Sequence, residues 1–221
     1  MTVEPKPSER RQAWEERWQQ QRADEFAWHL DEAPPELVEL LARTTLPAGG
    51  ALDVGCGNGV ATAYLATMFP VAVGIDIAHA AVSEARRNAA GAEFAVADAS
   101  VLPFADGSLA FVFDRGCLQN LPRDRWASYW SEVERVLAPG GVLQLFCSKA
   151  ARAFPPLLSR KGLRARAKWL LGRRAGPQFL SADLIRRLTP GDLRAEVLEE
   201  RPYRTTRGGL REAIFGVFRR A

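Results

Sequence analysis

Short apolar runs rich in β-branched and aromatic residues alternate with amphipathic runs through the middle of this chain. The apolar runs have the length and composition of buried strands, and the amphipathic runs carry apolar residues at helical spacing. Strands and helices that alternate in this way form βαβ units, whose strands pair in parallel within one sheet. The expected strands are ALDVG (51–55), VAVGIDI (71–77), AEFAVAD (92–98), LAFVFD (109–114) and GVLQLFCS (141–148).

The two ends of the chain follow different patterns. A polar helix is expected over 9–22, and a second helix at APPELVELLARTTL (33–46). Near the C-terminus, the helix SADLIRRL (181–188) precedes two consecutive strand patterns, at 195–204 and 211–220, which can pair antiparallel. The pattern predicts an α/β fold: a Rossmann-like, doubly wound, mostly parallel seven-stranded sheet with an antiparallel edge strand and a helical N-terminal extension.

Composition argues against several kinds of site. The 221 residues suit a single α/β domain. The cysteines Cys56, Cys117 and Cys147 lie far apart with no CxxC pair, and there are two histidines, so we expect no metal site. The N-terminus is polar, and no run approaches the roughly 20 apolar residues that span a bilayer. We therefore expect a soluble, cytoplasmic protein.

Basic residues are concentrated in one segment. The formal net charge is +4, but the stretch from Lys149 to Ala182 carries nine basic residues and no acid, which leaves the remainder of the chain acidic. Within it, LLSRKGLRARAKWLLGRR has an apolar face at helical spacing, which predicts a basic helical insertion at about 152–176. Three interpretations compete: a helix that covers the pocket, a helix on a membrane surface, and a nucleic-acid contact. We favour the first and expect no nucleic-acid partner, because a general nucleic-acid footprint would be broader.

Glycines crowd the turn after the first strand, in LDVGCGNG (52–59). A turn between the first strand and its helix is a common small-molecule site in α/β sheets. A P-loop would need a Lys-Ser/Thr pair after the glycines, and a dinucleotide fingerprint would need a glycine where Val60 stands. The pattern DxGxGxG from Asp53 fits S-adenosylmethionine better, because the acid can pair with cationic groups and bare amides at the helix start can face a carboxylate. A tight turn without a ligand is the alternative.

Two more acids end the next strands. Asp76 closes the second strand, where a carboxylate can accept both hydroxyls of a ribose, although it can also cap the following helix. Asp98 closes the third strand and can accept from an adenine amino group, while Ala99 and Ile77 flank the ring. Asp53, Asp76 and Asp98 would then share the carboxyl edge of the sheet, where ligands of α/β proteins bind.

The block from Gly50 to about Ser148 resembles the class I S-adenosylmethionine-dependent methyltransferases. The segments LDVGCGNG, VGIDIA, ADASVLPFADGSLAFVFDRG and EVERVLAPGGVLQLF are similar to the successive motifs of that family, in the same order. The resemblance implies methyl transfer from S-adenosyl-L-methionine by a methyltransferase domain at 35–221, with an N-terminal helical cap over the active site at 1–34. The cofactor contacts expected from it are Asp53, Gly55, Cys56, Gly57, Asp76, Ile77, Asp98, Ala99, Asp114 and Arg115.

The N-terminal segment WEERWQQQRADEFAWHLDEAPPELVELL is similar to that of thiopurine-type methyltransferases. In that family, a W-x-x-x-W helix and an F-x-H-like element fold over the cofactor and line the acceptor pocket. FDRGCLQNLP also resembles the family segment that borders the methyl group. The resemblance favours a thiol or selenol acceptor and adds Trp18 and Trp28 to the cofactor contacts, although ordinary packing of an amphipathic helix on the sheet is the alternative. The matching positions are Trp14, Trp18, Phe26, Trp28 and His29.

The sequence shows no constellation typical of a general base. Transfer to a thiolate needs none, because its attack on a sulfonium removes two charges and is favoured in a dry pocket. The catalytic candidates are Arg115 and His29. Arg115 can steady a thiolate or a carboxylated acceptor, or it can pair with a neighbouring acid. Cys117 is expected to be a small buried hydrophobic residue.

A methyltransferase acting on a small molecule, and on a thiol in particular, is the function that these patterns favour. An O- or N-methyltransferase of a small metabolite and a catalytically inactive methyltransferase-like binding module are the alternatives. An RNA methyltransferase is disfavoured, because DRGCLQN is not an NPPY-type motif and Cys117 lies outside the expected cysteine motif. The expected partner is a small-molecule methyl acceptor, and the patterns do not predict an oligomeric state.

Overall fold

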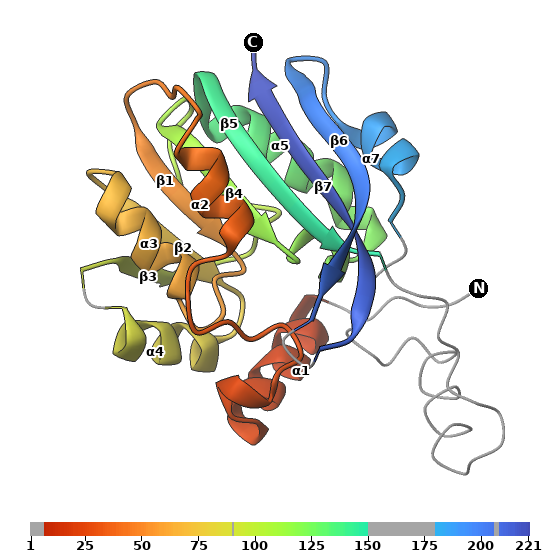
Figure 1. The fold of residues 1–221 in the computed structure, drawn as a ribbon. Coiled ribbons are helices and arrows are strands. Elements are labelled where there is room, and N and C mark those ends of the chain that lie inside the picture. Colours follow the sequence, from red (N-terminus) through yellow and green to blue (C-terminus); the bar gives the residue numbers. More distant parts are fainter. Residues whose placement is uncertain (1–6, 90, 150–179, 206–207) are drawn as a thin grey trace, which may run out of the picture.

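Seven strands form one sheet in the computed structural model, which describes residues 7–89, 91–149, 180–205 and 208–221. The strands are β1 (Gly50–Val54), β2 (Ala72–Asp76), β3 (Glu93–Val96), β4 (Leu109–Arg115), β5 (Leu137–Ser148), β6 (Leu193–Arg204) and β7 (Leu210–Arg220). Their order is β3-β2-β1-β4-β5-β7-β6 (Figure 1). β1 to β5 pair in parallel, and β7 is antiparallel to both β5 and β6. The predicted doubly wound, mostly parallel sheet with antiparallel pairing at one edge is confirmed.

Helices cover both faces of the sheet. The helices of the described residues are α1 (Pro7–Gln20), α2 (Pro35–Leu41), α3 (Val60–Met68), α4 (His79–Asn88), α5 (Trp126–Val136) and α7 (Ala182–Leu188). Side chains alternate along a strand, so Phe111 and Phe113 of β4 pack with α2 and α3, whereas Val112 between them packs with α5 and α7. Figure 1 shows α2 in front of the sheet and α5 behind it.

β5 begins earlier than the sequence predicts. The strand starts at Leu137, directly after α5, and so includes residues 137–140, which precede the strand predicted at 141–148. Within this segment the register against β4 shifts, which marks a bulge. Gly140 has a φ of +79°, a conformation that glycine adopts at no steric cost. The helix thus ends before the glycines, which lie in an irregular stretch at the start of the strand.

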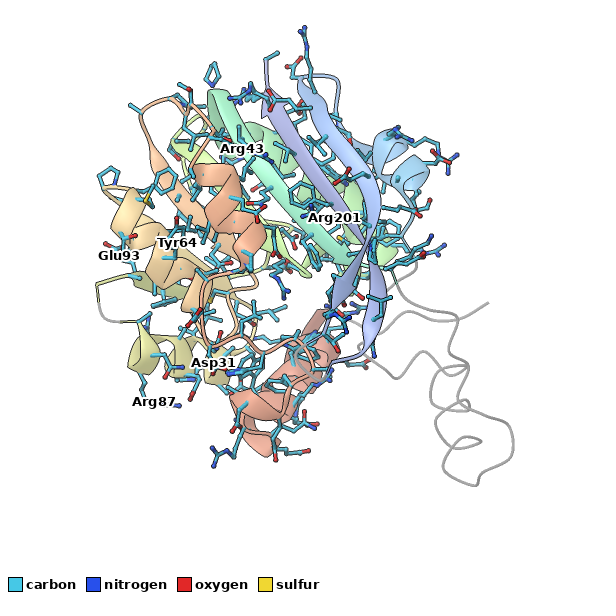
Figure 2. All side chains as sticks on the ribbon, in the orientation of Figure 1. Asp31, Arg43, Tyr64, Arg87, Glu93 and Arg201 are labelled. Carbon is cyan, nitrogen blue, oxygen red and sulfur yellow. The ribbon has the colours of Figure 1, made fainter. Side chains whose placement is uncertain are left out.

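The β6–β7 hairpin extends beyond the end of β5. β7 pairs with β5 only as far as Ala213, which lies opposite Ser148, whereas its pairing with β6 continues to Leu210. The end of the hairpin therefore overhangs the carboxyl edge of the parallel strands and approaches α1 (Figure 1). Arg201, which is labelled in Figure 2, lies 4.0 Å from the centroid of the Phe215 ring and links the two strands of this hairpin.

The predicted basic insertion at 152–176 lies outside the described residues, as does the membrane-surface contact considered for it. Among the helices of the described ranges, none is both long and apolar enough to cross a bilayer. The same ranges contain no group of histidine, cysteine and acidic side chains arranged to hold a metal ion.

Candidate active site

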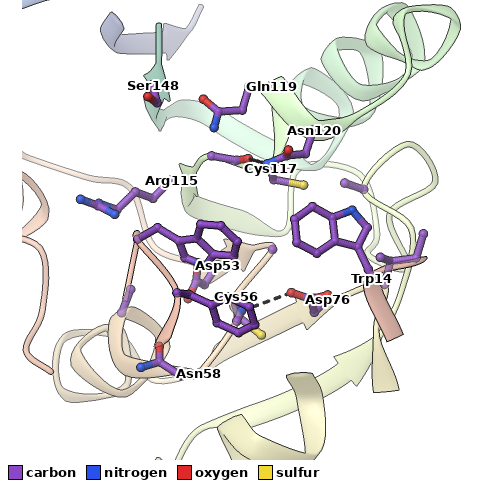
Figure 3. Close-up of a pocket in the computed structure, with 18 of the residues that line it drawn as sticks. Trp14, Asp53, Cys56, Asn58, Asp76, Arg115, Cys117, Gln119, Asn120 and Ser148 are labelled. Atoms are coloured by element: carbon purple, nitrogen blue, oxygen red, sulfur yellow. Dashed lines mark hydrogen bonds between the residues drawn. The ribbon is translucent and has the colours of Figure 1, made fainter. Parts of the chain in front are cut away.

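A cavity of about 470 Å³ lies at the carboxyl ends of the parallel strands. Small-molecule sites typically have volumes of about 300–1,000 Å³. The cavity is lined by α1 and the loop after it, the glycine turn, the loops after β2, β3 and β4, and the end of the β6–β7 hairpin. Figure 3 shows Asp53 and Asp76 toward one end and Gln119 and Ser148 toward the other. The predicted cofactor contacts that line it are Trp18, Trp28, Asp53, Gly55, Cys56, Gly57, Asp76, Ile77, Asp98, Ala99 and Arg115.

The glycine turn between β1 and α3 is tightly packed from two sides. Gly59 has a φ of +82°, and a Cβ there would lie 2.9 Å from the Cβ of Ala85 on α4. Gly57 has a φ of +54°, and the Trp18 ring lies over it, 3.4 Å from the position of a Cβ. Glycine is required at both positions because of the backbone conformation, and at Gly59 also because of the neighbouring helix. The turn thus keeps side chains out of the space beneath Trp18.

Asp53 and Asp98 are held by short local hydrogen bonds. Asp53 is buried, and its Oδ2 accepts a hydrogen bond of 2.6 Å from the hydroxyl of Thr62. Asp98 lies just after β3, and its Oδ1 accepts from the amide and the hydroxyl of Ser100 at 2.8 and 2.7 Å. Burial raises the pKa of Asp53 to about 7, and neighbouring carboxylates add to this effect. A carboxylate that is so poorly solvated gains most from a cationic ligand.

Asp76 connects the ends of two turns. Its Oδ2 accepts from the amide of Gly57 at 3.3 Å, and its Oδ1 accepts from the amide of Ala78 at 2.9 Å. Burial raises the pKa of Asp76 to about 6, although these amides oppose the shift. Ala78 occupies the N-cap position of α4, so Asp76 lies before the cap and does not fill it. The alternative interpretation of Asp76 as a helix cap is therefore wrong.

The structure does not bring Asp114 into the cavity, contrary to the sequence-based expectation. Its carboxylate is fully buried and accepts hydrogen bonds from the amides of Cys117 and Leu118 at 2.7 and 2.9 Å. The hydroxyl of Tyr129 donates a third hydrogen bond, of 2.7 Å. Asp114 thus connects the turn after β4 to the helix α5, and it lies beneath the cavity in the protein interior.

Aromatic rings of the N-terminal segment form a cluster on the wall of the cavity. Phe26 stacks on Trp28 with ring centroids 4.7 Å apart and meets Trp18 edge-on at 4.7 Å. Trp14 meets Trp28 edge-on at 6.1 Å, and the Arg17 guanidinium lies 4.6 Å from the Trp28 ring. All five side chains line the cavity. The tryptophans thus contribute to the pocket, and the alternative of an ordinary helix packed on the sheet does not describe them.

His29 joins the loop after α1 to the glycine turn. Its Nε2 lies 3.0 Å from Oδ1 of Asp31, and its Nδ1 lies 3.4 Å from the side-chain nitrogen of Asn58. Asn58 also donates to the carbonyl of Leu30. Because the amide of Asn58 donates, we assign Nδ1 as an acceptor and place the proton on Nε2. Both ring nitrogens are engaged, so the geometry favours a positioning role for His29 over that of a base.

Arg115 forms the ion pair that the sequence analysis considered. Its Nε lies 2.9 Å from Oε1 of Glu36 on α2, and both side chains are largely buried. The guanidinium also lies 4.8 Å from the centroid of the Phe146 ring. Arg115 is therefore fixed in place at the cavity wall, with its charge balanced by Glu36.

Sequence reasoning missed several lining residues. Arg10 shares one face of α1 with Trp14 and Trp18, and it donates to a backbone carbonyl in the loop after β4. The four-residue spacing of these side chains could have identified Arg10. Tyr203 and Arg211 come from the end of the β6–β7 hairpin, and no local sequence signal marks them.

Cys117 lines the cavity as a neutral thiol. Burial raises its pKa well above the usual value, and Asp114 and Asp76 raise it further. Burial has the same effect on the neighbouring lining residue Cys56. Because the thiolate is the reactive form, neither residue is suited to act as a nucleophile. This agrees with the expectation that Cys117 is a small hydrophobic residue.

The residues at the glycine-turn end fit S-adenosylmethionine. Asp76 would accept the ribose hydroxyls, and Ile77 and Ala99 would border the adenine ring. All three residues line the cavity at the carboxyl edge of the sheet. The raised pKa of Asp53 suits a ligand that carries an ammonium and a sulfonium. At the opposite end of the cavity, Gln119 is 9% exposed, and its Oε1 has no hydrogen-bond partner among the described residues. A donor from a bound ligand would satisfy this buried oxygen.

Comparisons with known proteins agree with this geometry. Residues 51–141 match the family described as "Methyltransferase domain". The chain is 32% identical over 135 residues to the 2-heptyl-1-hydroxyquinolin-4(1H)-one methyltransferase of Mycobacteroides abscessus, an alignment that covers 58% of each chain. It is 37% identical over 143 residues to the 27-O-demethylrifamycin SV methyltransferase of Amycolatopsis mediterranei, with 61% of this chain and 52% of the relative covered. The chain thus spans about half the length of these curated relatives.

Solved structures extend the similarity to the whole fold. A structure from work on the conversion of a disulfide bond into a thioacetal group during echinomycin biosynthesis superimposes with a TM-score of 0.71 at 26% identity, covering 95% of this chain and 91% of the other. A methyltransferase from Anabaena variabilis has the same fold, with a TM-score of 0.69 at 16% identity and coverage of 100% and 98%. Residues 51–141 thus match a methyltransferase domain, and the chain as a whole has the Rossmann-like fold that class I S-adenosylmethionine-dependent methyltransferases share. S-adenosylmethionine is the cofactor of this class.

Binding of S-adenosylmethionine is expected to tighten as the pH rises from 5 to 8. The pKa of Asp53, about 7, falls when a cation binds beside it, and the pKa of Asp76, about 6, falls when its carboxylate accepts the ribose hydroxyls, so binding releases protons. Protonation of Asp76 at pH 5 should by itself lower the affinity about tenfold relative to pH 8, and protonation of Asp53 should lower it further. Calorimetry in buffers of different ionisation enthalpy measures both quantities. In Asp76→Asn the step near pH 6 should disappear, and equal affinity at both pH values in the unchanged protein would contradict the prediction.

Proposed function

We propose that this protein transfers a methyl group from S-adenosylmethionine to the sulfur of a small thiol. The acceptor lies between the aromatic cluster of the N-terminal segment and the residues that follow β4. Residues 1–34 serve as a cap over this site, and the remaining chain forms the catalytic domain. The observation that carries the proposal is the cavity itself: carboxylates gather at the glycine turn, aromatic rings cover the middle, and among the described lining residues no side chain is poised as a base toward the acceptor.

The lining groups explain why a thiol is preferred. Both nitrogens of His29 are engaged, and burial keeps the Cys117 thiol neutral. Asp53 and Asp76 lie at the glycine turn, where the cofactor binds. The described lining residues therefore offer an acceptor in this pocket no base to ionise it. Thiols with a pKa near 8.5 do so at neutral pH far more readily than phenols with a pKa near 10.

The aromatic wall supplies the remaining requirement of the reaction. The cofactor provides a methyl group on a sulfonium, which an anionic nucleophile attacks in line. Trp14, Trp18 and Phe26 exclude water from the space above the glycine turn, and the dry environment favours the meeting of opposite charges. The N-terminal likeness to thiopurine-type enzymes and the likeness to a protein of disulfide-to-thioacetal conversion support a sulfur acceptor.

An O- or N-methyltransferase is the second candidate. The curated relatives with the names quoted above act on a hydroxyquinolone and a demethylrifamycin, and neither name indicates a thiol. The family match at residues 51–141 covers the cofactor half of the chain, and the cap and the hairpin end lie outside it. The cap and the end of the hairpin would select the methyl acceptor, so acceptor choice must be tested directly on this chain.

Turnover with 4-methylthiophenol is expected to exceed turnover with 4-methylphenol by at least about 10-fold at pH 7.5. The two acceptors have the same shape, and the thiol supplies far more anion at that pH. A labelled methyl group on the cofactor allows both products to be quantified. The rate for the thiol should rise with pH until the free acceptor is ionised and then become constant.

The control is His29→Ala, which should leave the shape of this pH profile unchanged. Equal rates on the two acceptors would contradict sulfur selectivity. A bell-shaped profile that disappears in His29→Ala would identify His29 as a base and favour an oxygen or nitrogen acceptor.

A further inference from the structure

Charged groups in the cavity are separated into two ends. The lining carboxylates Asp53, Asp76 and Asp98 lie at or just after the carboxyl ends of β1, β2 and β3, on one half of the sheet. Arginines line the cavity from α1, the segment that ends β4 and follows it, and the hairpin, and no acid of the described lining residues lies among them. The half of the cavity beyond β4 is therefore cationic, although the cofactor that binds in the other half already carries a sulfonium.

A connected cluster places Arg211 at this cationic end. Arg211 lies opposite Tyr203 in the β6–β7 hairpin. The Tyr203 ring meets Phe146 edge-on at 5.1 Å, and its hydroxyl donates to Oγ of Ser148 at 2.9 Å. Because Ser148 accepts this bond, its own hydroxyl proton is available to another acceptor. The Arg115 guanidinium lies 4.8 Å from the centroid of the same Phe146 ring.

The guanidinium of Arg211 differs from that of Arg115 in its partners. Arg115 is balanced by Glu36 at 2.9 Å. Arg211 makes no ion pair with any acid of the described residues, and Arg125, after β4, makes none either. Both residues line the cavity. An arginine beside a pocket, with an available serine hydroxyl nearby, matches the donors that recognise a carboxylate.

We propose that the methyl acceptor carries a carboxylate, which binds to Arg211 and the Ser148 hydroxyl while its thiol lies toward the glycine turn. The inference rests on the proposed function for the thiol as the methyl acceptor. The binding of a carboxylate is argued only from Arg211, Tyr203 and Ser148. The aromatic cluster accommodates an apolar or aromatic body between the two ends. The substrate class is therefore a mercapto acid with an aromatic or apolar body.

The test compares 4-mercaptobenzoate with 4-mercaptobenzamide, which has a similar shape but no charge. Binding of each is followed by tryptophan fluorescence with S-adenosylhomocysteine present, because Trp14, Trp18 and Trp28 line the cavity. The carboxylate should bind about 10- to 100-fold more tightly, as expected for charge-assisted hydrogen bonds. In Arg211→Gln this preference should be lost, and the KM for 4-mercaptobenzoate should rise by the same factor with kcat little changed.

Arg204→Gln is the matched control. Arg204 is an exposed arginine on the same hairpin, adjacent to Tyr203 and so directed to the other face of the strand. It should retain the preference for the carboxylate, and both variants should bind S-adenosylhomocysteine like the parent. Equal binding of the acid and the amide, or an equal loss in both variants, would overturn the inference.

Failure of the proposed function gives a different result. If neither thiol is methylated but 4-mercaptobenzoate still binds in an Arg211-dependent manner, the carboxylate site is supported and the thiol acceptor is wrong. If both thiols are methylated at equal rates and Arg211→Gln changes neither KM, the methyltransferase activity is supported and the carboxylate site is wrong.

Discussion

Replacement of Asp114 by alanine is expected to lower the free energy of unfolding by about 3–5 kcal/mol. The carboxylate accepts hydrogen bonds from two backbone amides and from the Tyr129 hydroxyl, all in the interior. Each buried donor left without a partner costs about 1–3 kcal/mol, and small voids add to this cost. Urea unfolding followed by circular dichroism at pH 7.5 measures the loss.

Tyr129→Phe separates the hydroxyl from the amides. It removes one donor while the two amides keep their acceptor, so a loss of about 1 kcal/mol is expected. If Asp114→Ala were no more destabilising than Tyr129→Phe, the amides of Cys117 and Leu118 would not depend on this carboxylate. In that case the assignment of Asp114 as a structural residue would fail.

The contrast between Asp114 and the other strand-ending acids shows which features of the site can be predicted from the sequence. The sequence places Asp53, Asp76 and Asp114 at the ends of buried strands, and the parallel sheet then brings all three to one edge. It does not indicate whether a side chain enters the cavity or turns under it. Asp114 turns inward because Tyr129 of α5 lies within hydrogen-bond distance, a contact between residues 15 positions apart.

The acceptor end of the cavity was hardest to predict. Tyr203 and Arg211 reach it because the β6–β7 pairing continues past the last β5–β7 pair, and the register of two strands cannot be read from their separate patterns. The N-terminal cluster was easier, because Trp14 and Trp18 share a helical face. Even there, the contacts of His29 with Asp31 and Asn58 depend on how the loop meets the glycine turn.

Replacement of Asp76 by alanine is expected to weaken S-adenosylmethionine binding by roughly 100-fold at pH 8. The ionised carboxylate would accept both ribose hydroxyls, and each such charge-assisted bond is worth about 1.5–3 kcal/mol. Its loss also frees the amide of Gly57, which shifts the glycine turn from its present position. Calorimetry with S-adenosylmethionine and with S-adenosylhomocysteine should show similar losses, because both ligands contain the ribose.

Stability should change in the opposite direction from affinity. Burial raises the pKa of Asp76 to about 6, so the ionised group is less favourable in the folded protein than in the unfolded chain. This penalty is fully present at pH 8 and disappears as the pH falls below the unfolded value near 4. Asp76→Ala should therefore melt at the same temperature as the parent, or higher, at pH 8.

The control is Asp192→Ala, at the opposite edge of the sheet. It should change neither the affinity for S-adenosylmethionine nor the melting temperature. An Asp76 variant that binds normally, or that loses affinity only because it unfolds, would refute a direct contact with the cofactor.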